Sequence, residues 1–371
     1  MGIEIIGKLT QKNNGDFKLV DLENVDYDGT GKSAKQELEK KIEEAKNSST
    51  PYDDTKIKTD INTIKTDLGT EELTTTAKDV KGAVNDLSSQ IDEIASIPDK
   101  TDIAKSINEL ISNGVQIIKI PYGNHYVSEP IKLKSSVTLL GNKNSLLYTD
   151  KNISIITTDD ANVQYDDICL FGLNIRQDHA GIITNYAINL KNANMCHIDK
   201  VTVCTNNDNI ESVGGLKVYS EMEPGTGLAY SILIDNCDFR DSSLDINITD
   251  CYISNTNVWG NKRKFAVHLG ASSQQLDNCQ FVGGDVYGAV WVQDTKNDYN
   301  IEIIKISNCY FDGSYENIKS GYGLYAKGMR YSNISNCSFW YQKKDGILLD
   351  GCVGSTFTNL TFEGSGRNNI K

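Results

Sequence analysis

A six-residue pattern recurs through the C-terminal half of the chain: an apolar residue, any residue, Asn, a small or apolar residue, any residue and a second apolar residue. Clear copies lie at 234–239, 253–258, 276–281, 306–311, 334–339 and 357–362, and weaker copies without Asn lie at 170–175 and 198–203. Successive copies are 19 to 36 residues apart. This spacing is too irregular for a propeller or a helical repeat, and it is typical of β-helix coils with loops of variable length.

The Asn of each copy is expected to form a tight corner between two strands, because Asn tolerates the left-handed backbone conformation that such a corner requires. Its amide is expected to bond to the equivalent Asn one coil away, which gives an internal ladder with a structural role. These asparagines are Asn236, Asn255, Asn278, Asn308, Asn336 and Asn359. The fourth position points inward and often holds a cysteine, expected to be a reduced, buried side chain: Cys237, Cys279, Cys309 and Cys337.

A second pattern, apolar, any residue, apolar, lies between these corners, usually after Gly or Ala, and predicts a further strand in each coil. Because strand side chains alternate, the middle residue of each triplet points to solvent, and stacked coils align these residues in one column. The predicted column is Asn189, Lys217, Asn247, His268, Trp291, Tyr325 and Leu348. Its second half is apolar and aromatic, which suits stacking on the C–H faces of sugars. A loop or a neighbouring subunit that covers the column is the alternative.

The segment before the first coils predicts how the solenoid begins. An amphipathic helix is expected from 103 to about 113, followed by a strand over 115–120 and a P-x-G-x-x-Y motif at 121–126. This order resembles the opening of the pectate-lyase-like β-helices found in many phage tail spikes. The resemblance implies an all-β fold over 99–371, a right-handed parallel β-helix of the pectin-lyase type, with the helix covering the otherwise unpaired sheet edge.

Residues 50–97 carry apolar positions spaced alternately four and three apart, as in two short heptad blocks of a coiled coil. Ile at both seam positions favours three strands or more, so 32–98 is expected to be a trimerisation region; an ordinary helical pair packed on its own chain is the alternative. Part of this region, 68–87, resembles a linker and helix common in phage tail and neck-fibre proteins. The preceding segment, 1–31, is strand-rich and too small for its own core, and it is expected to attach the chain to a virion.

The charge and composition of the chain limit the classes of partner that it can bind. The chain has 37 Lys and Arg against 50 Asp and Glu, a formal charge of −13, which opposes binding to nucleic acid. It has no run of about eighteen apolar residues, so no membrane insertion is expected. None of the nine cysteines lies in a CxxC pair and only four His are present, so neither a metal site nor another cofactor is predicted.

The resemblance to tail spikes implies a homotrimeric tail spike or receptor-binding protein, made in the host cytoplasm and carried on the virion tail. Its expected partners are phage tail or baseplate proteins and bacterial surface polysaccharide or teichoic acid. The predicted carbohydrate-binding residues are His268, Trp291 and Tyr325. Two alternatives stay open: a depolymerase (glycoside hydrolase, lyase or phosphodiesterase) acting on the same polymer, and a non-catalytic structural component that carries a further C-terminal domain.

A depolymerase of the hydrolase type would need two carboxylates about 5.5 Å apart or somewhat more. In pectate-lyase-like proteins the active groove lies along the strands of the second pattern, so acids beside those strands are the candidates. The predicted catalytic residues are Asp285, Asp294 and Asp345. In so acidic a chain, an Asp in a loop is usually a solvated turn residue, and this is the alternative for each of the three. Residues 369–371 run as if into another coil, which predicts a β-helix truncated at its C-terminal end.

Overall fold

The computed structural model describes residues 102–371 except 159, 161, 208, 222–229, 297–299 and 315–320, together with residues 40 and 43 and two strands near the N-terminus. These two strands, β1 (Lys8–Asn13) and β2 (Asp16–Asp21), form an antiparallel hairpin. The chain divides into two compact units, Met1–Thr76 and Ala77–Lys371. The predicted coiled coil over 50–97 lies outside the described residues.

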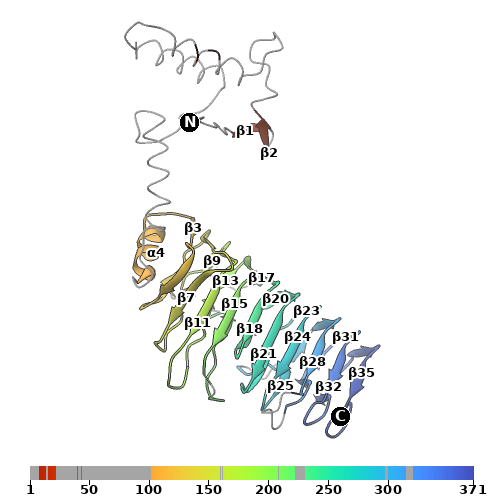
Figure 1. Ribbon diagram of the computed structural model, residues 1–371. Coiled ribbons are helices and arrows are strands. Elements are labelled where there is room, and N and C mark those ends of the chain that lie inside the picture. Colours follow the sequence, from red (N-terminus) through yellow and green to blue (C-terminus); the bar gives the residue numbers. More distant parts are fainter. Residues whose placement is uncertain are drawn as a thin grey trace. The chain divides into compact units, whose positions relative to one another are not determined.

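The C-terminal unit is a β-helix in which three long parallel sheets run side by side along the stack of coils (Figure 1). The first sheet contains β3 (Ile117–Lys119), β6 (Thr138–Leu140), β10 (Cys169–Phe171), β14 (Cys196–Asp199), β17 (Tyr230–Asp235), β20 (Thr249–Ser254), β23 (Gln275–Asp277), β27 (Lys305–Ser307), β31 (Asn333–Ser335) and β34 (Thr356–Thr358). The second contains β4 (Gly123–Tyr126), β7 (Ser145–Thr149), β11 (Asn174–Gln177), β15 (Thr202–Thr205), β18 (Asp238–Arg240), β21 (Asn257–Asn261), β24 (Gln280–Gly283), β28 (Tyr310–Asp312), β32 (Ser338–Trp340) and β35 (Thr361–Glu363).

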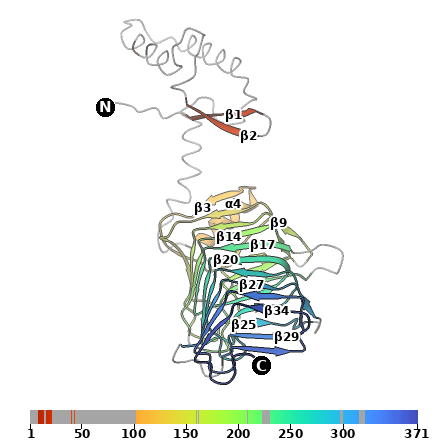
Figure 2. The same ribbon diagram turned by 90° about the vertical axis from the view of Figure 1, so that its right-hand side faces the viewer.

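The third sheet is formed by the strands of the apolar triplets. It contains β5 (Ile131–Lys132), β8 (Ile156–Thr158), β12 (Ile188–Lys191), β16 (Gly215–Tyr219), β19 (Ser243–Asn247), β22 (Phe265–Leu269), β25 (Gly288–Val292), β29 (Leu324–Lys327) and β33 (Ile347–Asp350). Two short pairs, β9 (Tyr165–Asp166) with β13 (Ala193–Asn194) and β26 (Ile301–Glu302) with β30 (Met329–Arg330), lie outside these sheets. The turned view shows the strands stacked coil above coil (Figure 2). The expected all-β solenoid is therefore confirmed.

The six corner asparagines stack between the first and second sheets, and each has the left-handed backbone conformation, with φ between 49° and 55°. Their side chains are exposed, so the expectation of an internal ladder is wrong. The ladder is also interrupted: Asn278 donates to Asn255 over 2.7 Å, whereas Asn308 donates to the carboxylate of Asp277 over 2.8 Å. Asn is therefore needed at the corner for its left-handed backbone conformation and not for a buried amide. At the surface, the side-chain amides bond to asparagines of neighbouring coils or to carboxylates at strand ends.

Inside the solenoid, equivalent residues of successive coils stack directly on one another. Phe281, Phe311 and Phe339 are paired in register, and their ring centroids are 5.5 Å and 4.4 Å apart. The predicted cysteine column is also buried and its thiols are free. Burial raises the pKa of the Cys237 thiol to about 12, so this cysteine stays protonated and acts as a small apolar side chain.

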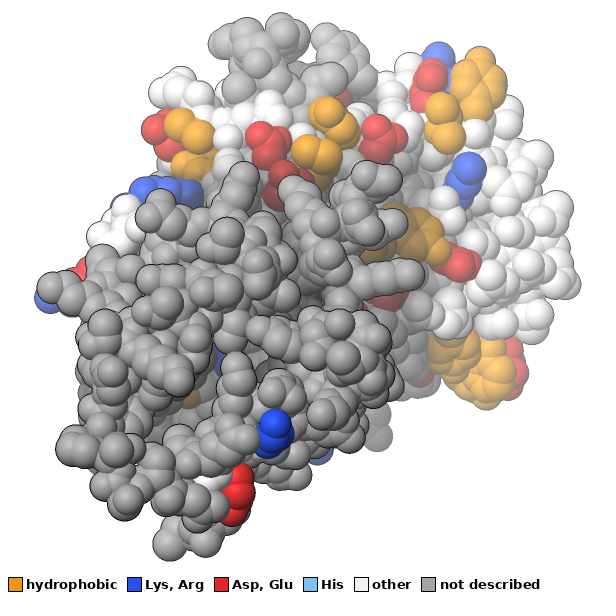
Figure 3. Space-filling model, turned by 90° about the horizontal axis from the view of Figure 1, so that it is seen from above, with side chains coloured by type: hydrophobic (Ala, Val, Ile, Leu, Met, Phe, Trp, Pro, Cys, Tyr) orange, Lys and Arg blue, Asp and Glu red, His pale blue; other side chains and the backbone are white. Residues whose placement is uncertain are grey.

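The predicted helix is α4 (Ile103–Ser112), which covers the end of the solenoid next to β3 (Figure 1). Asp102 begins it by accepting a hydrogen bond from the backbone N–H of Ala104, and Asn113 ends it. Asn108 joins it to the first coil by accepting from the N–H of Lys132 over 2.8 Å. Among the described residues, no helix is long and apolar enough to cross a bilayer. The face in Figure 3 has acidic, basic and hydrophobic side chains interspersed on its described part.

Candidate functional site

The outer face of the third sheet brings together the residues predicted to bind carbohydrate. Trp291 of β25 pairs with His268 of β22 on one side and with Tyr325 of β29 on the other. Tyr325 pairs in turn with Leu348 of β33. The register thus confirms the predicted alignment of the second half of the column, and adjacent members are about 4.8 Å apart along the stack.

The first half of the column differs from the prediction at one position. Lys217 pairs with Asp245, and Asp245 pairs with His268, so Asp245 occupies the place expected for Asn247. The prediction failed because the triplets at 244–246 and 246–248 both fit an apolar, any, apolar pattern. Only the pairing of β19 with its neighbours decides between registers two residues apart.

Asp245 lies at the centre of a buried polar cluster. Its Oδ1 accepts a hydrogen bond from His268 Nδ1 over 2.7 Å, and its Oδ2 lies 3.7 Å from Lys217 Nζ. The Tyr186 hydroxyl donates to the same Oδ2 over 3.4 Å. Burial by itself raises the pKa of Asp245, but the hydrogen bond and charge of His268, followed by Lys217, outweigh it, so the pKa is lowered. The carboxylate is therefore ionised, and the sequence analysis did not single it out.

His268 is held on both sides by acceptors. Besides its bond to Asp245, its Nε2 donates to the backbone carbonyl of Gln293 over 2.8 Å. Both ring nitrogens therefore lie within hydrogen-bond distance of an oxygen acceptor. The side chain is only 3% exposed. The expectation that His268 faces solvent is therefore wrong, because the ring is used inside the polar cluster.

Four aromatic rings, Tyr287, Trp291, Tyr322 and Tyr325, form what we call the aromatic face. Trp291 stacks on His268 with centroids 4.1 Å apart, and Tyr287 stacks on the other side of Trp291 at 4.0 Å with planes 10° apart. Tyr325 lies 6.4 Å from Tyr287 and 5.7 Å from Tyr322. Trp291 is 9% exposed because Tyr287 covers it, whereas the three tyrosines are half-buried. The surface offered to a ligand is thus mainly tyrosine.

The loop before β25 explains this covering. Tyr287 and Tyr322 each directly precede a glycine that starts or precedes a third-sheet strand, and the N–H of Ala289 donates to the carbonyl of Tyr322. The register sets Tyr322 beside Gly288, so Tyr287 lies one residue earlier in its coil than Tyr322 does. Gly288 has φ +103°, and a Cβ there would lie 2.4 Å from the carbonyl oxygen of Tyr322. The repeated Tyr-Gly pair before the triplet was the sequence signal that could have identified both tyrosines.

The three predicted carboxylates lie in different local settings. Asp285 and Asp294 flank opposite ends of β25, a strand of five residues that spans about 16 Å. The Asp294 carboxylate accepts from the N–H of Lys296, as in a turn. Asp345 is 1% exposed and accepts from both the N–H and the side-chain amide of Asn368, which ties it to the last coil. Among the described residues, no group of His, Cys, Asp and Glu is placed to hold a metal ion.

Comparisons with known proteins agree with this fold. A family model described as a right-handed β-helix region matches residues 245–371. A tailspike protein double mutant of the Escherichia coli bacteriophage HK620, solved with a pentasaccharide, has a TM-score of 0.52 at 13% identity, and the likeness covers 73% of this chain and 60% of the tailspike. A polygalacturonase from Erwinia carotovora gives 0.51 at 11% identity, over 73% and 94% of the two chains. At these identities the likeness shows the fold alone. No curated protein matches the sequence.

Proposed function

We propose that this chain is a phage tail spike or receptor-binding protein whose β-helix binds bacterial surface polysaccharide or teichoic acid on the outer face of the third sheet. The observation that carries the proposal is the aromatic face, with Tyr287 stacked on Trp291 and Tyr325 beside them. In this proposal residues 1–31 attach the chain to the tail or baseplate and residues 32–98 hold three chains together. The protein is then part of the virion.

Two physical features support binding of sugars at this face. Aromatic rings combine a large apolar area with few rotatable bonds, so they lose little entropy when a sugar stacks on them. Here the rings are also fixed before a ligand arrives, because Trp291 packs between Tyr287 and a His268 that is itself held by Asp245. A preformed surface of this kind lowers the cost of ordering on binding.

The fold is compatible with this role. The HK620 tailspike, which shares this fold, was solved in complex with a pentasaccharide. This chain spans three fifths of that tailspike's length. The role proposed here rests on the aromatic face and not on the likeness.

Binding is favoured over cleavage. Glycoside hydrolysis uses two carboxylates within about 5 to 10 Å of each other, and Asp285 and Asp294 are separated by the length of β25. Asp345 is engaged with Asn368. Depolymerase activity stays the alternative, and we propose that the aromatic face is an adhesive surface.

Capture of host polymer tests the proposal. Purified wall polysaccharide and teichoic acid from candidate hosts are immobilised, and binding of the intact chain is compared with that of Tyr325→Ala. We expect the variant to bind at least tenfold more weakly, whereas Tyr122→Ala, a tyrosine that is 74% exposed and outside the aromatic face, serves as the control and should bind normally. Equal binding by all three proteins would remove the aromatic face as the site. Shortening of the polymer by the intact chain would instead support the depolymerase alternative.

A further inference from the structure

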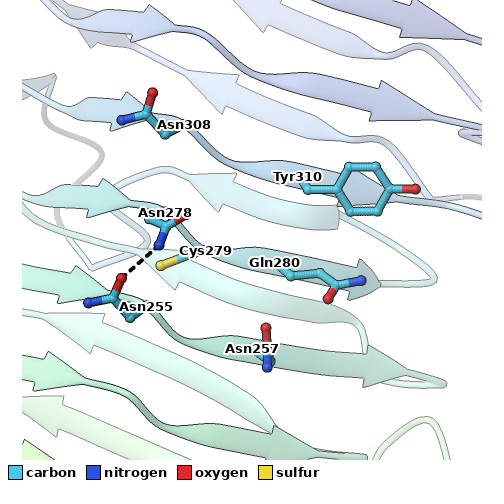
Figure 4. Close-up of a pocket in the computed structure, with 7 residues that line it drawn as sticks. All are labelled: Asn255, Asn257, Asn278, Cys279, Gln280, Asn308 and Tyr310. Atoms are coloured by element: carbon cyan, nitrogen blue, oxygen red, sulfur yellow. Dashed lines mark hydrogen bonds between the residues drawn. The ribbon is translucent and has the colours of Figure 1, made fainter.

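A second polar surface lies beside the corner asparagines, at the start of the second-sheet strands. It is a shallow hollow of about 420 Å³, which we call the corner groove. The residues that line it are Asn255, Asn257, Asn278, Cys279, Gln280, Asn308 and Tyr310 (Figure 4).

The corner groove contains side chains held by hydrogen bonds to one another and side chains that make no hydrogen bond among the described residues. Asn278 donates to Asn255 (Figure 4). Asn255 in turn donates to the Asp235 carboxylate over 2.8 Å. By contrast, the side chains of Asn257, Gln280 and Tyr310 make no hydrogen bond within the part of the chain that the structure describes. These three side chains therefore project from a rigid sheet with donors and acceptors available to a ligand.

The three uncommitted side chains form a row. Asn257 of β21 pairs with Gln280 of β24, and Gln280 pairs with Tyr310 of β28. Since adjacent coils are about 4.8 Å apart, the row is about 10 Å long, close to the length of two sugar rings. Tyr310 ends the row with a half-buried ring supported by Trp340, whose centroid is 5.7 Å away.

The charge at the edge of the corner groove determines which class of sugar can bind there. The carboxylates of Asp235 and Asp277 bind the ladder amides Asn255 and Asn308 along the edge of the groove. The hydrogen bonds from Ser254 and Asn255 outweigh the effect of burial and lower the pKa of Asp235, so this edge is negatively charged. An anionic glycan would be repelled there, whereas amide groups both donate to and accept from sugar hydroxyls.

We propose that the corner groove is a second glycan subsite, specific for a neutral oligosaccharide, in which Asn257 and Gln280 bind sugar hydroxyls and Tyr310 stacks on a sugar face. This inference rests on the proposed function, because it assigns a further part of the same polymer to a different side of the solenoid. The ladder asparagines keep their structural role and hold the groove in shape.

Two of the three tryptophans of the chain, Trp291 and Trp340, separate the two sites in an experiment made in a Trp259→Phe background, because Trp259 lies two residues after Asn257 on the outer face of β21. Trp291 belongs to the aromatic face, whereas Trp340 contacts Tyr310 beside the corner groove. The full-length chain is first applied to an array of neutral and acidic bacterial oligosaccharides of at least three sugar units. Each glycan that binds is then titrated into Trp291→Phe and Trp340→Phe while tryptophan fluorescence is recorded.

We expect at least one neutral glycan to change the fluorescence of Trp291→Phe but not that of Trp340→Phe. Gln280→Ala and Tyr310→Ala should each weaken this binding about tenfold, while Tyr122→Ala and Tyr325→Ala leave it unchanged. If only acidic glycans bind, or if Gln280→Ala and Tyr310→Ala bind as the unaltered chain does, the subsite is wrong. If Tyr325→Ala captures polymer normally while Gln280→Ala and Tyr310→Ala lose the neutral glycan, the aromatic face has failed and the corner groove holds. If Tyr325→Ala loses capture while Gln280→Ala and Tyr310→Ala bind as the unaltered chain does, the corner groove has failed and the aromatic face holds.

Discussion

His268 Nδ1 lies 2.7 Å from Asp245 Oδ1, and the two residues are paired across adjacent coils of the third sheet. This hydrogen bond connects the polar part of the outward column to its aromatic part, because the His268 ring also stacks face to face on Trp291. The orientation of the aromatic face is therefore set by a buried hydrogen bond one coil away.

Asp245→Asn is expected to destabilise the protein by about 1–3 kcal/mol, the range for disturbing a buried hydrogen bond to a charged group, because a neutral amide replaces the carboxylate that contacts His268 Nδ1 and Lys217 Nζ. The change should be measured by urea unfolding followed by circular dichroism. Glu211→Gln, which removes an exposed partner of Lys264, is the control and should cost no more than about 1 kcal/mol.

Stability should also fall at acid pH, in part through the same carboxylate. The pKa of Asp245 is lowered in the folded chain, so the unfolded chain binds more protons there. The resulting stabilisation is present above the unfolded pKa of about 3.9 and is lost as the pH falls through the lower folded value. Unfolding midpoints measured from about pH 6 down to pH 2 should therefore drop less steeply for Asp245→Asn than for the unaltered chain. Parallel pH profiles would contradict the lowered pKa.

Tyr287→Ala should uncover Trp291. The tyrosine ring lies 4.0 Å from the indole and nearly parallel to it, so its removal admits water to a side chain that is now 9% exposed. Tryptophan emission is expected to shift to longer wavelength and acrylamide quenching to increase. The same substitution made in Trp291→Phe should change neither property, which assigns the effect to this one indole.

Phe311→Ala should be among the most destabilising core substitutions, at about 3–5 kcal/mol, because Phe311 is fully buried and stacks between Phe281 and Phe339. Phe311→Leu leaves a smaller cavity and should cost less. Tyr331→Ala, at a side chain that is 62% exposed, should be close to neutral. Thermal unfolding under one fixed scan rate would rank the three variants, and a neutral Phe311→Ala would contradict the stacked core.

Asn278 offers a test of the corner. Its φ of 51° is left-handed, and its amide bonds to Asn255. Asn278→Gly loses only the amide contacts, about 1 kcal/mol, whereas Asn278→Ala also places a Cβ in a conformation that costs a further 1–2 kcal/mol, roughly. The expected order of stability is Asn, then Gly, then Ala. An alanine variant more stable than the glycine variant would show that backbone shape does not select Asn here.

The sequence by itself determined the coil repeat, the positions of the corners and the residues of the core. These features follow from local rules: a left-handed corner selects Asn at positions such as Asn255, and strand alternation places Phe311 and Cys309 inward. Since both rules act within a few residues of chain, a single sequence reveals them.

Only the tertiary structure decided what the outer surface offers. It placed Asp245 in the column instead of Asn247, put the asparagine ladder on the surface, and buried His268 and Trp291. Each of these outcomes depends on which residue of one coil lies beside which residue of the next, or on where a loop carries a side chain such as Tyr287. The periodicity of a strand fixes which face a side chain takes but not its partner there, so register and loop conformation had to come from the packing of whole coils.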